Sequence, residues 1–148
     1  MDTKNHYTNG FTLMEMLVVL ALVGVLAVIA LPSFAQQIKQ GRVTSNANQL
    51  HSVYKFARSE AAKRNEQINL VVVGKQWRVK MGAEVLSVFE PSHDSITISN
   101  LSDLTINSMG STSNIQFQIQ GADDTTDNYS LCIYISGQSK LVKGALCS

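Results

Sequence analysis

The sequence predicts an α+β protein in which a long N-terminal helix, transmembrane and then amphipathic, packs on a C-terminal antiparallel β-sheet domain. An almost wholly apolar run covers residues 11–31, and apolar residues then recur at helical spacing until about Arg64. Short alternating segments, separated by Gly, Ser, Asn and Asp, fill the rest of the 148-residue chain. We therefore expect a polar leader, a transmembrane helix, an amphipathic helix and a β-rich head over residues 1–10, 11–35, 36–65 and 66–148.

The apolar run is long enough to cross a membrane and holds one carboxylate near its start. As a helix, residues 11–31 span about 31 Å, roughly the hydrocarbon thickness of a bilayer. An unpaired charge such as Glu15 costs on the order of 2.5–3.5 kcal/mol on insertion scales, which makes Glu15 a predicted functional residue. A secretory signal peptide normally has a shorter apolar core, and a plain signal anchor explains the length of the run but not Glu15.

The helix is expected to continue past the apolar run as an amphipathic segment. Pro32 should kink it, because the proline ring removes one backbone donor and clashes with the preceding turn. Lys63 and Arg64 suit a helix C-terminus, where cations meet the negative end of the dipole. The apolar stripe recurs at spacings of three and four and consists of Val43, Ala47, Leu50, Tyr54, Ala57 and Ala61.

Beyond residue 66 the apolar pattern changes to that of strands. Residues 68–73 and 77–81, joined through Gly74-Lys75-Gln76, predict a β-hairpin. One sheet, or two small sheets, is expected to pack on the apolar stripe of the helix. The other predicted strands are residues 85–89, 96–98, 104–106, 115–119, 131–135 and 140–142.

Two motifs resemble a known family. Gly10-Phe11-Thr12-Leu13-Met14-Glu15, followed by the apolar run and Pro32, resembles the type IV pilin signal. The stretch Phe56-Ala57-Arg58-Ser59-Glu60-Ala61-Ala62-Lys63-Arg64-Asn65, leading into Ile68, is similar to the GspH/FimT (FimU-like) group of minor pilins and pseudopilins. The resemblance implies the pilin fold, cleavage after Gly10 by a prepilin peptidase, N-methylation of Phe11 and retention of the apolar helix.

The resemblance also implies partners and a location. Pilins place the new amine, here at Phe11, against the glutamate of a neighbouring subunit, so Glu15 is the expected assembly residue. The chain would be a single-pass protein of the bacterial inner membrane with a periplasmic head, and would then enter a pilus or pseudopilus. Its partners would be other pilins or pseudopilins, contacted through the N-terminal helix.

The two cysteines, Cys132 and Cys147, favour a disulfide. An even pair in a part of the chain that lies outside the cytoplasm is typical of a disulfide, and the bond would reinforce a small head. Metal-ligating thiolates and free buried thiols are the alternatives. A metal site at the two thiolates would need further ligands, and no histidine lies near either cysteine in the sequence.

Charge is unevenly distributed and raises the question of DNA binding. From Lys39 to Lys80 there are nine basic and two acidic residues, a net +7, whereas residues 81–139 hold seven acids and no Lys or Arg. Several FimT-like proteins carry a Gly-Arg-x-Arg motif near the C-terminus, where this chain has Lys140 and Lys143 and no arginine. A solvated helix face with acidic loops is the alternative. Duplex DNA is a candidate partner if the predicted strands 77–81 and 140–142 lie close together, because their lysines could then form one phosphate-binding stripe. The candidate phosphate-binding residues are Lys75, Arg78, Lys80, Lys140 and Lys143.

Catalytic and metal-binding patterns are weak. His51 and His93 have no Cys, His or carboxylate at convincing ligand spacing, and no phosphate-binding loop is present in the sequence. We therefore expect no enzyme activity, no cofactor and no metal. The predicted function is that of a minor type IV pilin that integrates into or primes a pilus, with FimT-like DNA capture for natural transformation as an additional role. The alternative is a GspH-like pseudopilin of a type II secretion system.

Overall fold

The computed structural model describes residues 11–123, 125–144 and 147, which form one long helix followed by eight strands. Helix α1 covers Leu13–Arg64. The chain divides into two compact units, residues 1–35 and residues 36–148, and α1 contributes to both. The observed elements confirm the predicted α+β class, with a long helix and antiparallel sheets.

Local hydrogen bonds define both ends of α1. The helix begins at Leu13 and not at Phe11, because the Thr12 hydroxyl caps it by accepting a hydrogen bond from the Glu15 N–H at 3.2 Å. At the other end Asn65 adopts a left-handed conformation, φ 54°, and the Glu66 N–H donates to the Ala61 carbonyl at 3.2 Å. This pairing is the Schellman arrangement, which terminates helices. The helix assignment includes Pro32 without a break, and a kink there stays a prediction.

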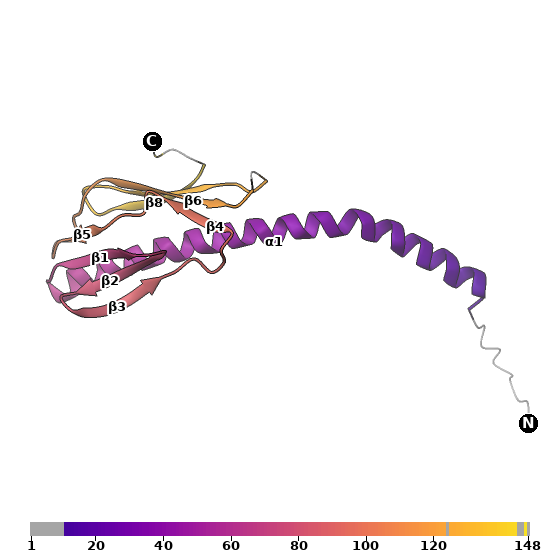
Figure 1. The fold of residues 1–148 in the computed structure, drawn as a ribbon, viewed down its shortest axis with the longest axis horizontal. Helices are drawn as coiled ribbons and strands as arrows, with labels where there is room; N and C mark the ends of the chain where they lie inside the picture. Colours follow the sequence, from indigo (N-terminus) through magenta and orange to yellow (C-terminus); the bar gives the residue numbers. More distant parts are fainter. Residues whose placement is uncertain (1–10, 124, 145–146, 148) are drawn as a thin grey trace, which may run out of the picture. The chain divides into compact units, whose positions relative to one another are not determined.

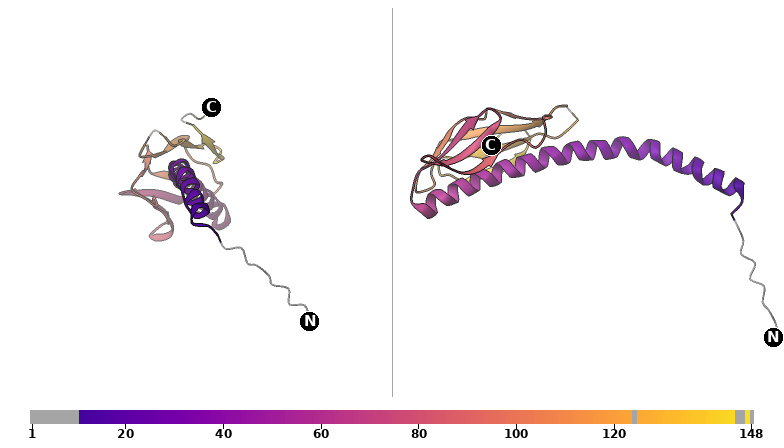
Figure 2. Two further views of the ribbon diagram at one scale, coloured as in Figure 1. Left: turned by 90° about the vertical axis from the view of Figure 1, so that its right-hand side faces the viewer. Right: turned by 60° about the horizontal axis from the view of Figure 1, so that its bottom comes forward.

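The head contains two antiparallel four-stranded sheets, which lie along the second half of α1 (Figure 1; Figure 2). The first has the order β3-β2-β1-β5, with β1 at Ile68–Val73, β2 at Gln76–Met81, β3 at Glu84–Phe89 and β5 at Leu104–Ile106. The second has the order β4-β6-β7-β8, with β4 at Ile96–Ser99, β6 at Ile115–Gly121, β7 at Tyr129–Ile133 and β8 at Ser139–Lys143.

The predicted hairpin is confirmed by the pairing of β1 with β2. Val73 lies opposite Gln76, so Gly74 and Lys75 form a two-residue turn. Gly74 has φ 62°, a conformation that a residue with a side chain rarely adopts.

One predicted strand is displaced. The apolar segment 131–135 predicts a strand over those residues, but β7 covers Tyr129–Ile133. The Tyr134 N–H donates to the Gln138 carbonyl at 2.9 Å, and the Gly137 N–H donates to the Tyr134 carbonyl at 2.7 Å. These bonds close the turn to β8, so Tyr134 and Ile135 belong to the turn even though both are apolar.

The core lies between the amphipathic half of α1 and the two sheets. All six residues of the predicted helical stripe are fully buried, which confirms that stripe. Trp77 on β2 meets Phe117 on β6 edge to face, with ring centroids 5.1 Å apart, and so connects the two sheets. The indole N–H of Trp77 donates to the Ser102 carbonyl at 3.1 Å, which satisfies its polar atom inside the core.

Candidate functional site

The N-terminal part of α1 presents an apolar surface. Side chains of residues 11–28 are exposed, among them Phe11 at 76% and Leu20 at 65%. By length and composition alone, α1 is the one helix among the described residues that could cross a membrane. Such a surface is unfavourable in water and suits lipid or neighbouring helices.

Glu15 lies in the first turn of α1, at the third position after its cap Thr12. Thr12-Leu13-Met14-Glu15 has the form of a capping box, and a carboxylate there also interacts favourably with the positive end of the helix dipole. This local role was visible in the sequence as Thr-x-x-Glu but was not part of the prediction. Within the described residues, no basic side chain forms an ion pair with Glu15.

The disulfide between Cys132 and Cys147 is present, as predicted. Cys132 lies on β7 and its Cα is 5.8 Å from that of Cys147 in the C-terminal tail. Neither cysteine is free, so the alternatives of thiolate ligands and free thiols do not hold.

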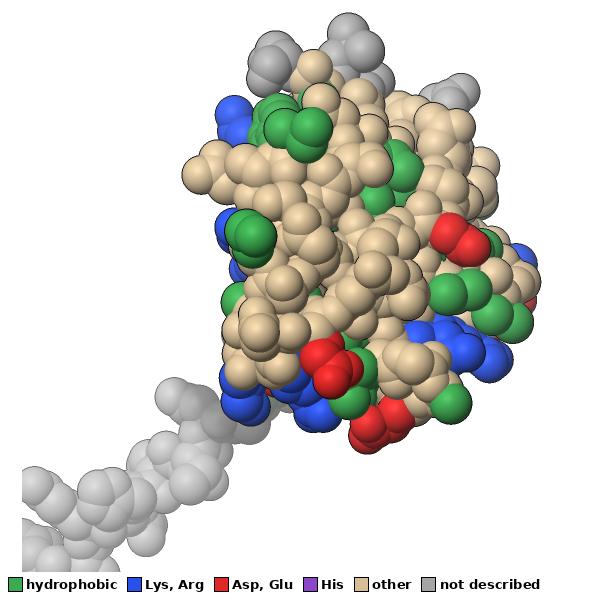
Figure 3. All heavy atoms as spheres, turned by 90° about the vertical axis from the view of Figure 1, so that its left-hand side faces the viewer, with side chains coloured by type: hydrophobic (Ala, Val, Ile, Leu, Met, Phe, Trp, Pro, Cys, Tyr) green, Lys and Arg blue, Asp and Glu red, His purple; other side chains and the backbone are tan. Residues whose placement is uncertain are grey.

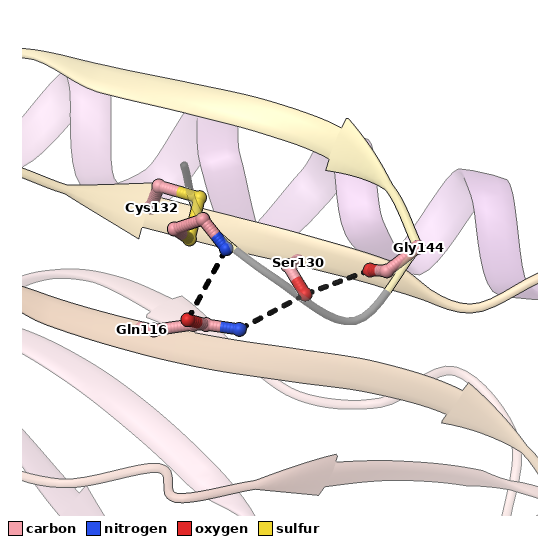
Figure 4. The surroundings of a disulfide bond; sticks show 5 residues. Gln116, Ser130, Cys132 and Gly144 are labelled. Carbon is pink, nitrogen blue, oxygen red and sulfur yellow. Dashed lines mark hydrogen bonds between the residues drawn. A yellow bond between two sulfur atoms is a disulfide. The ribbon is translucent and has the colours of Figure 1, made fainter.

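Hydrogen bonds also hold Gly144 and Cys147 against β7 and β6 (Figure 4). The Cys147 N–H donates to Oε1 of Gln116 at 3.4 Å, and the Gln116 amide donates to the Ser130 hydroxyl at 3.3 Å. The Ser130 hydroxyl, fully buried, in turn donates to the Gly144 carbonyl at 2.8 Å. The disulfide therefore joins Cys147 to β7 at a place where polar side chains of β6 and β7 already bind Gly144 and Cys147.

The five candidate DNA-binding residues are divided between the two sheets. Lys75 is in the β1–β2 turn and Arg78 and Lys80 are on β2, in the first sheet, whereas Lys140 and Lys143 are on β8, in the second. The strands β2 and β8 therefore belong to different sheets. A shared phosphate-binding stripe on these two strands stays a prediction.

Several of these cations are also engaged within the head. Nζ of Lys75 lies 3.0 Å from the Asp94 carboxylate, and this hydrogen bond lowers the pKa of Asp94. Nζ of Lys143 lies 2.7 Å from Asp127, which raises the pKa of Lys143. The Arg78 guanidinium donates twice to the Gln76 amide oxygen, at 2.9 and 2.7 Å.

Lys140 is instead grouped with two cations that the prediction did not include. It lines a groove of about 640 Å³ together with Lys55 and Arg58 of α1. Within the described residues, no group of three or more His, Cys, Asp or Glu side chains is placed to hold a metal ion.

Comparison with known protein families gives a match to the amphipathic part of α1 and most of the head. The model described as Type II transport protein GspH matches residues 46–139, well over half of the chain. The chain belongs to the GspH family. The match begins in the amphipathic part of α1, spans both sheets and ends at the first residue of β8.

A second model, described as Prokaryotic N-terminal methylation motif, matches residues 5–31 of this GspH-family chain. The match contains the expected cleavage and methylation residues, Gly10 and Phe11, and the assembly residue Glu15. Gly10 itself lies outside the described residues.

Two crystal structures of the type IV minor pilin FimU from Pseudomonas aeruginosa PAO1, in different space groups, resemble this fold. The TM-scores are 0.62 and 0.59, and the sequence identity is 22% in both. The alignments cover 70% and 67% of this chain and 90% and 91% of the FimU chains. The GspH-family chain therefore has the fold of a minor pilin. None of the curated proteins matches it.

Proposed function

We propose that this GspH-family chain is a minor type IV pilin that integrates into, or primes, a pilus through its N-terminal helix. The observation that carries the proposal is the exposed apolar helix with Glu15 in its first turn, inside the match to the N-terminal methylation motif. A prepilin peptidase would cleave after Gly10, and methylation would follow at Phe11. The disulfide supports a head on the periplasmic side of the inner membrane, because disulfides persist in oxidising compartments.

The proposed mechanism pairs Glu15 with the N-terminal amine of a neighbouring subunit. In the bilayer an ionised carboxylate needs a positive partner, and within the described residues of this chain none pairs with Glu15. Two charges buried together are tolerated only when they pair well, so the pair would align the incoming subunit along the filament. An attached leader moves the amine away, and processing therefore acts as the switch for assembly.

Substitution of Glu15 tests this proposal. Glu15→Val should leave membrane insertion intact, because it removes a charge from the hydrocarbon region. It should reduce incorporation into sheared pilus fractions, while Glu15→Asp, which keeps the charge, should retain much of it. Normal incorporation of Glu15→Val would show that the carboxylate is not an assembly partner.

Processing can be tested separately by mass spectrometry of the mature protein. We expect an N-terminal methyl-Phe11, and Gly10→Arg should block cleavage because it replaces the small residue at the scissile bond. A mature chain that retains Met1, or that begins after the apolar run, would contradict the proposal.

A pseudopilin of a type II secretion system is the second candidate, and the description of the matching family model favours it. Deletion of the gene separates the two. Loss of pili with normal protein secretion is expected for a minor pilin, whereas loss of secretion with normal pili is expected for a pseudopilin.

DNA capture is a further role that would use the same assembled pilus. Its support is the charge of the candidate residues, but Lys75 and Lys143 already form ion pairs with Asp94 and Asp127. Titration of the head with duplex DNA at several salt concentrations tests this role. Binding that weakens steeply with salt, by a log–log slope of about 0.9 per phosphate contact, would support it.

A further inference from the structure

A groove runs between the C-terminal part of α1 and the turn that leads into β8. We call it the α1–β8 groove. Its volume is about 640 Å³, which is within the range of sites that hold a ligand or a short peptide segment. Its lining residues include Lys55, Arg58, Met109, Gly110, Gln138 and Lys140.

The helix wall of the groove follows from sequence spacing. This wall begins with Lys55, and the other helix residues that line it follow Lys55 by three, four and seven positions. Residues at this spacing lie on one face of a helix. They are Arg58, Ser59 and Ala62. This face lies beside the buried stripe, because the fully buried Tyr54, Ala57 and Ala61 come directly before Lys55, Arg58 and Ala62 in the sequence. The core contacts of α1 therefore fix the direction in which this wall faces.

The opposite wall is held in place by contacts with the same helix. Nε of Arg58 donates to the Gly110 carbonyl at 3.2 Å, and its Nη2 donates to the Ser136 carbonyl at 3.4 Å. The Tyr54 hydroxyl donates to the Gly137 carbonyl at 2.8 Å. Gly137 has φ 75° and lies so close to the Gly110 carbonyl that no side chain fits there. The groove is thus preformed by two loops and a helix.

The charge of the α1–β8 groove has one sign. Lys55, Arg58 and Lys140 line it, and none of its described lining residues is acidic. These three cations take part in none of the ion pairs of the described residues, unlike Lys75 and Lys143. A pocket with unpaired cations attracts carboxylates or phosphates.

Apolar side chains accompany these cations. Met109, which lines the groove, is 85% exposed, and Ile135 in the adjoining turn is 67% exposed. The Thr112 N–H donates to the Ile135 carbonyl at 3.1 Å, so the two loops that carry these side chains lie together. Figure 3 faces the end of the head where α1 ends, and Lys and Arg side chains there lie beside exposed hydrophobic ones. Met is an adaptable contact residue at binding surfaces.

We infer that the α1–β8 groove binds an acidic peptide segment of a neighbouring subunit, with its carboxylates at Lys55, Arg58 and Lys140 and an apolar side chain against Met109. The inference rests on the proposed function, because it requires an assembly that supplies the neighbour. A heterologous contact of this kind, in which different surfaces of two subunits meet, extends into open filaments.

A peptide fits these observations better than a nucleic acid. Affinity for duplex DNA comes largely from many Lys and Arg contacts to phosphates, about 6–10 in a strongly salt-dependent binder. The groove offers only three cations, and one of them, Arg58, already donates to two backbone carbonyls. The exposed apolar side chain of Met109 cannot make an apolar contact with a phosphate backbone, whereas it can pack against an apolar residue of a peptide.

Site-specific photocrosslinking of the full chain, in cells that assemble the pilus or pseudopilus, tests the inference. The probe p-benzoylphenylalanine is placed at Gln138, whose exposed side chain lines the groove, and crosslinked peptides are identified by mass spectrometry. The same probe at Leu22, 60% exposed on the apolar helix, reports on assembly. We expect the Gln138 probe to capture a segment of another pilin that contains Asp or Glu.

Charge reversal provides the matched control. Lys55→Glu combined with Lys140→Glu should reduce the Gln138 crosslink about tenfold, because each substitution replaces an attraction with a repulsion. Lys80→Glu, on β2 and outside the groove, should leave the crosslink unchanged.

The outcomes separate the two proposals. Crosslinks from Leu22 to other pilins, with none from Gln138 or with nucleic acid as the Gln138 partner, would overturn the groove inference and leave the pilin function standing. An equal Gln138 yield in the charge-reversed protein would also overturn it. Absence of crosslinks from both positions would overturn the pilin function and the groove inference with it.

Discussion

Removal of the disulfide should strongly destabilise the head. Cys147→Ser breaks a bond between residues 15 positions apart, and a closed loop of about 15 residues corresponds to about 3 kcal/mol in the chain-entropy model. The tail would also lose the constraint that holds the Cys147 N–H against Gln116, so we expect a loss of about 2–5 kcal/mol. For a domain of this size, a loss of about 3 kcal/mol lowers the melting temperature by roughly 10–20 °C.

Urea unfolding of residues 36–148, the compact unit of the head, measures this effect. The oxidised wild type is compared with Cys147→Ser and with the wild type in reductant. Because the bond acts mainly on the unfolded chain, the reduced wild type and the variant should unfold together, with a steeper denaturant dependence than the oxidised protein. The reductant should have no effect on Cys147→Ser, which serves as the control.

The reasoning would be refuted by equal unfolding midpoints for the oxidised wild type and Cys147→Ser. Such a result would mean that the hydrogen bonds of Gln116 and Ser130 hold the tail without the covalent link. A midpoint shift without a change in slope would point to strain or packing in the folded state as the source of the effect.

The sequence was sufficient to predict the elements of the head because their signals are local. The helical stripe is a matter of spacing along one segment, and the β1–β2 turn is marked by Gly74. The displaced strand β7 shows the limit of this approach. Tyr134 and Ile135 continue an apolar run, but hydrogen bonds to Gln138 and within the turn take them out of the strand.

The grouping of charges could not be predicted in the same way, because sheet order is not a local property. Lys80 and Lys140 are both strand lysines, and nothing in their neighbourhoods indicates that they belong to different sheets. The α1–β8 groove was missed for a related reason. Lys55 and Arg58 share a helix face that the sequence reveals, but Lys140 on the opposite wall comes from the last strand of the chain.

Two further predictions concern the head. Trp77→Ala should destabilise it by about 3–5 kcal/mol, and a double-mutant cycle with Phe117→Ala should give a coupling of about 0.5–1.5 kcal/mol, because the two rings connect the sheets. Additive urea midpoints would contradict that coupling. The second prediction is a loss of stability in acid. Glu60 is buried, 8% exposed, and its hydrogen bond from Arg64 at 2.6 Å lowers its pKa below 4.5. A carboxyl whose pKa is lower in the folded than in the unfolded protein stabilises the fold above the unfolded pKa, and this contribution disappears as the pH falls through the folded pKa. The wild type should therefore lose stability from about pH 4.5 downward. Glu60→Gln, which cannot titrate at this position, should be less stable than the wild type near neutral pH and should lose less stability on acidification. Thermal unfolding as a function of pH measures both, and parallel curves for the two proteins would show that the Glu60–Arg64 pair does not contribute to stability.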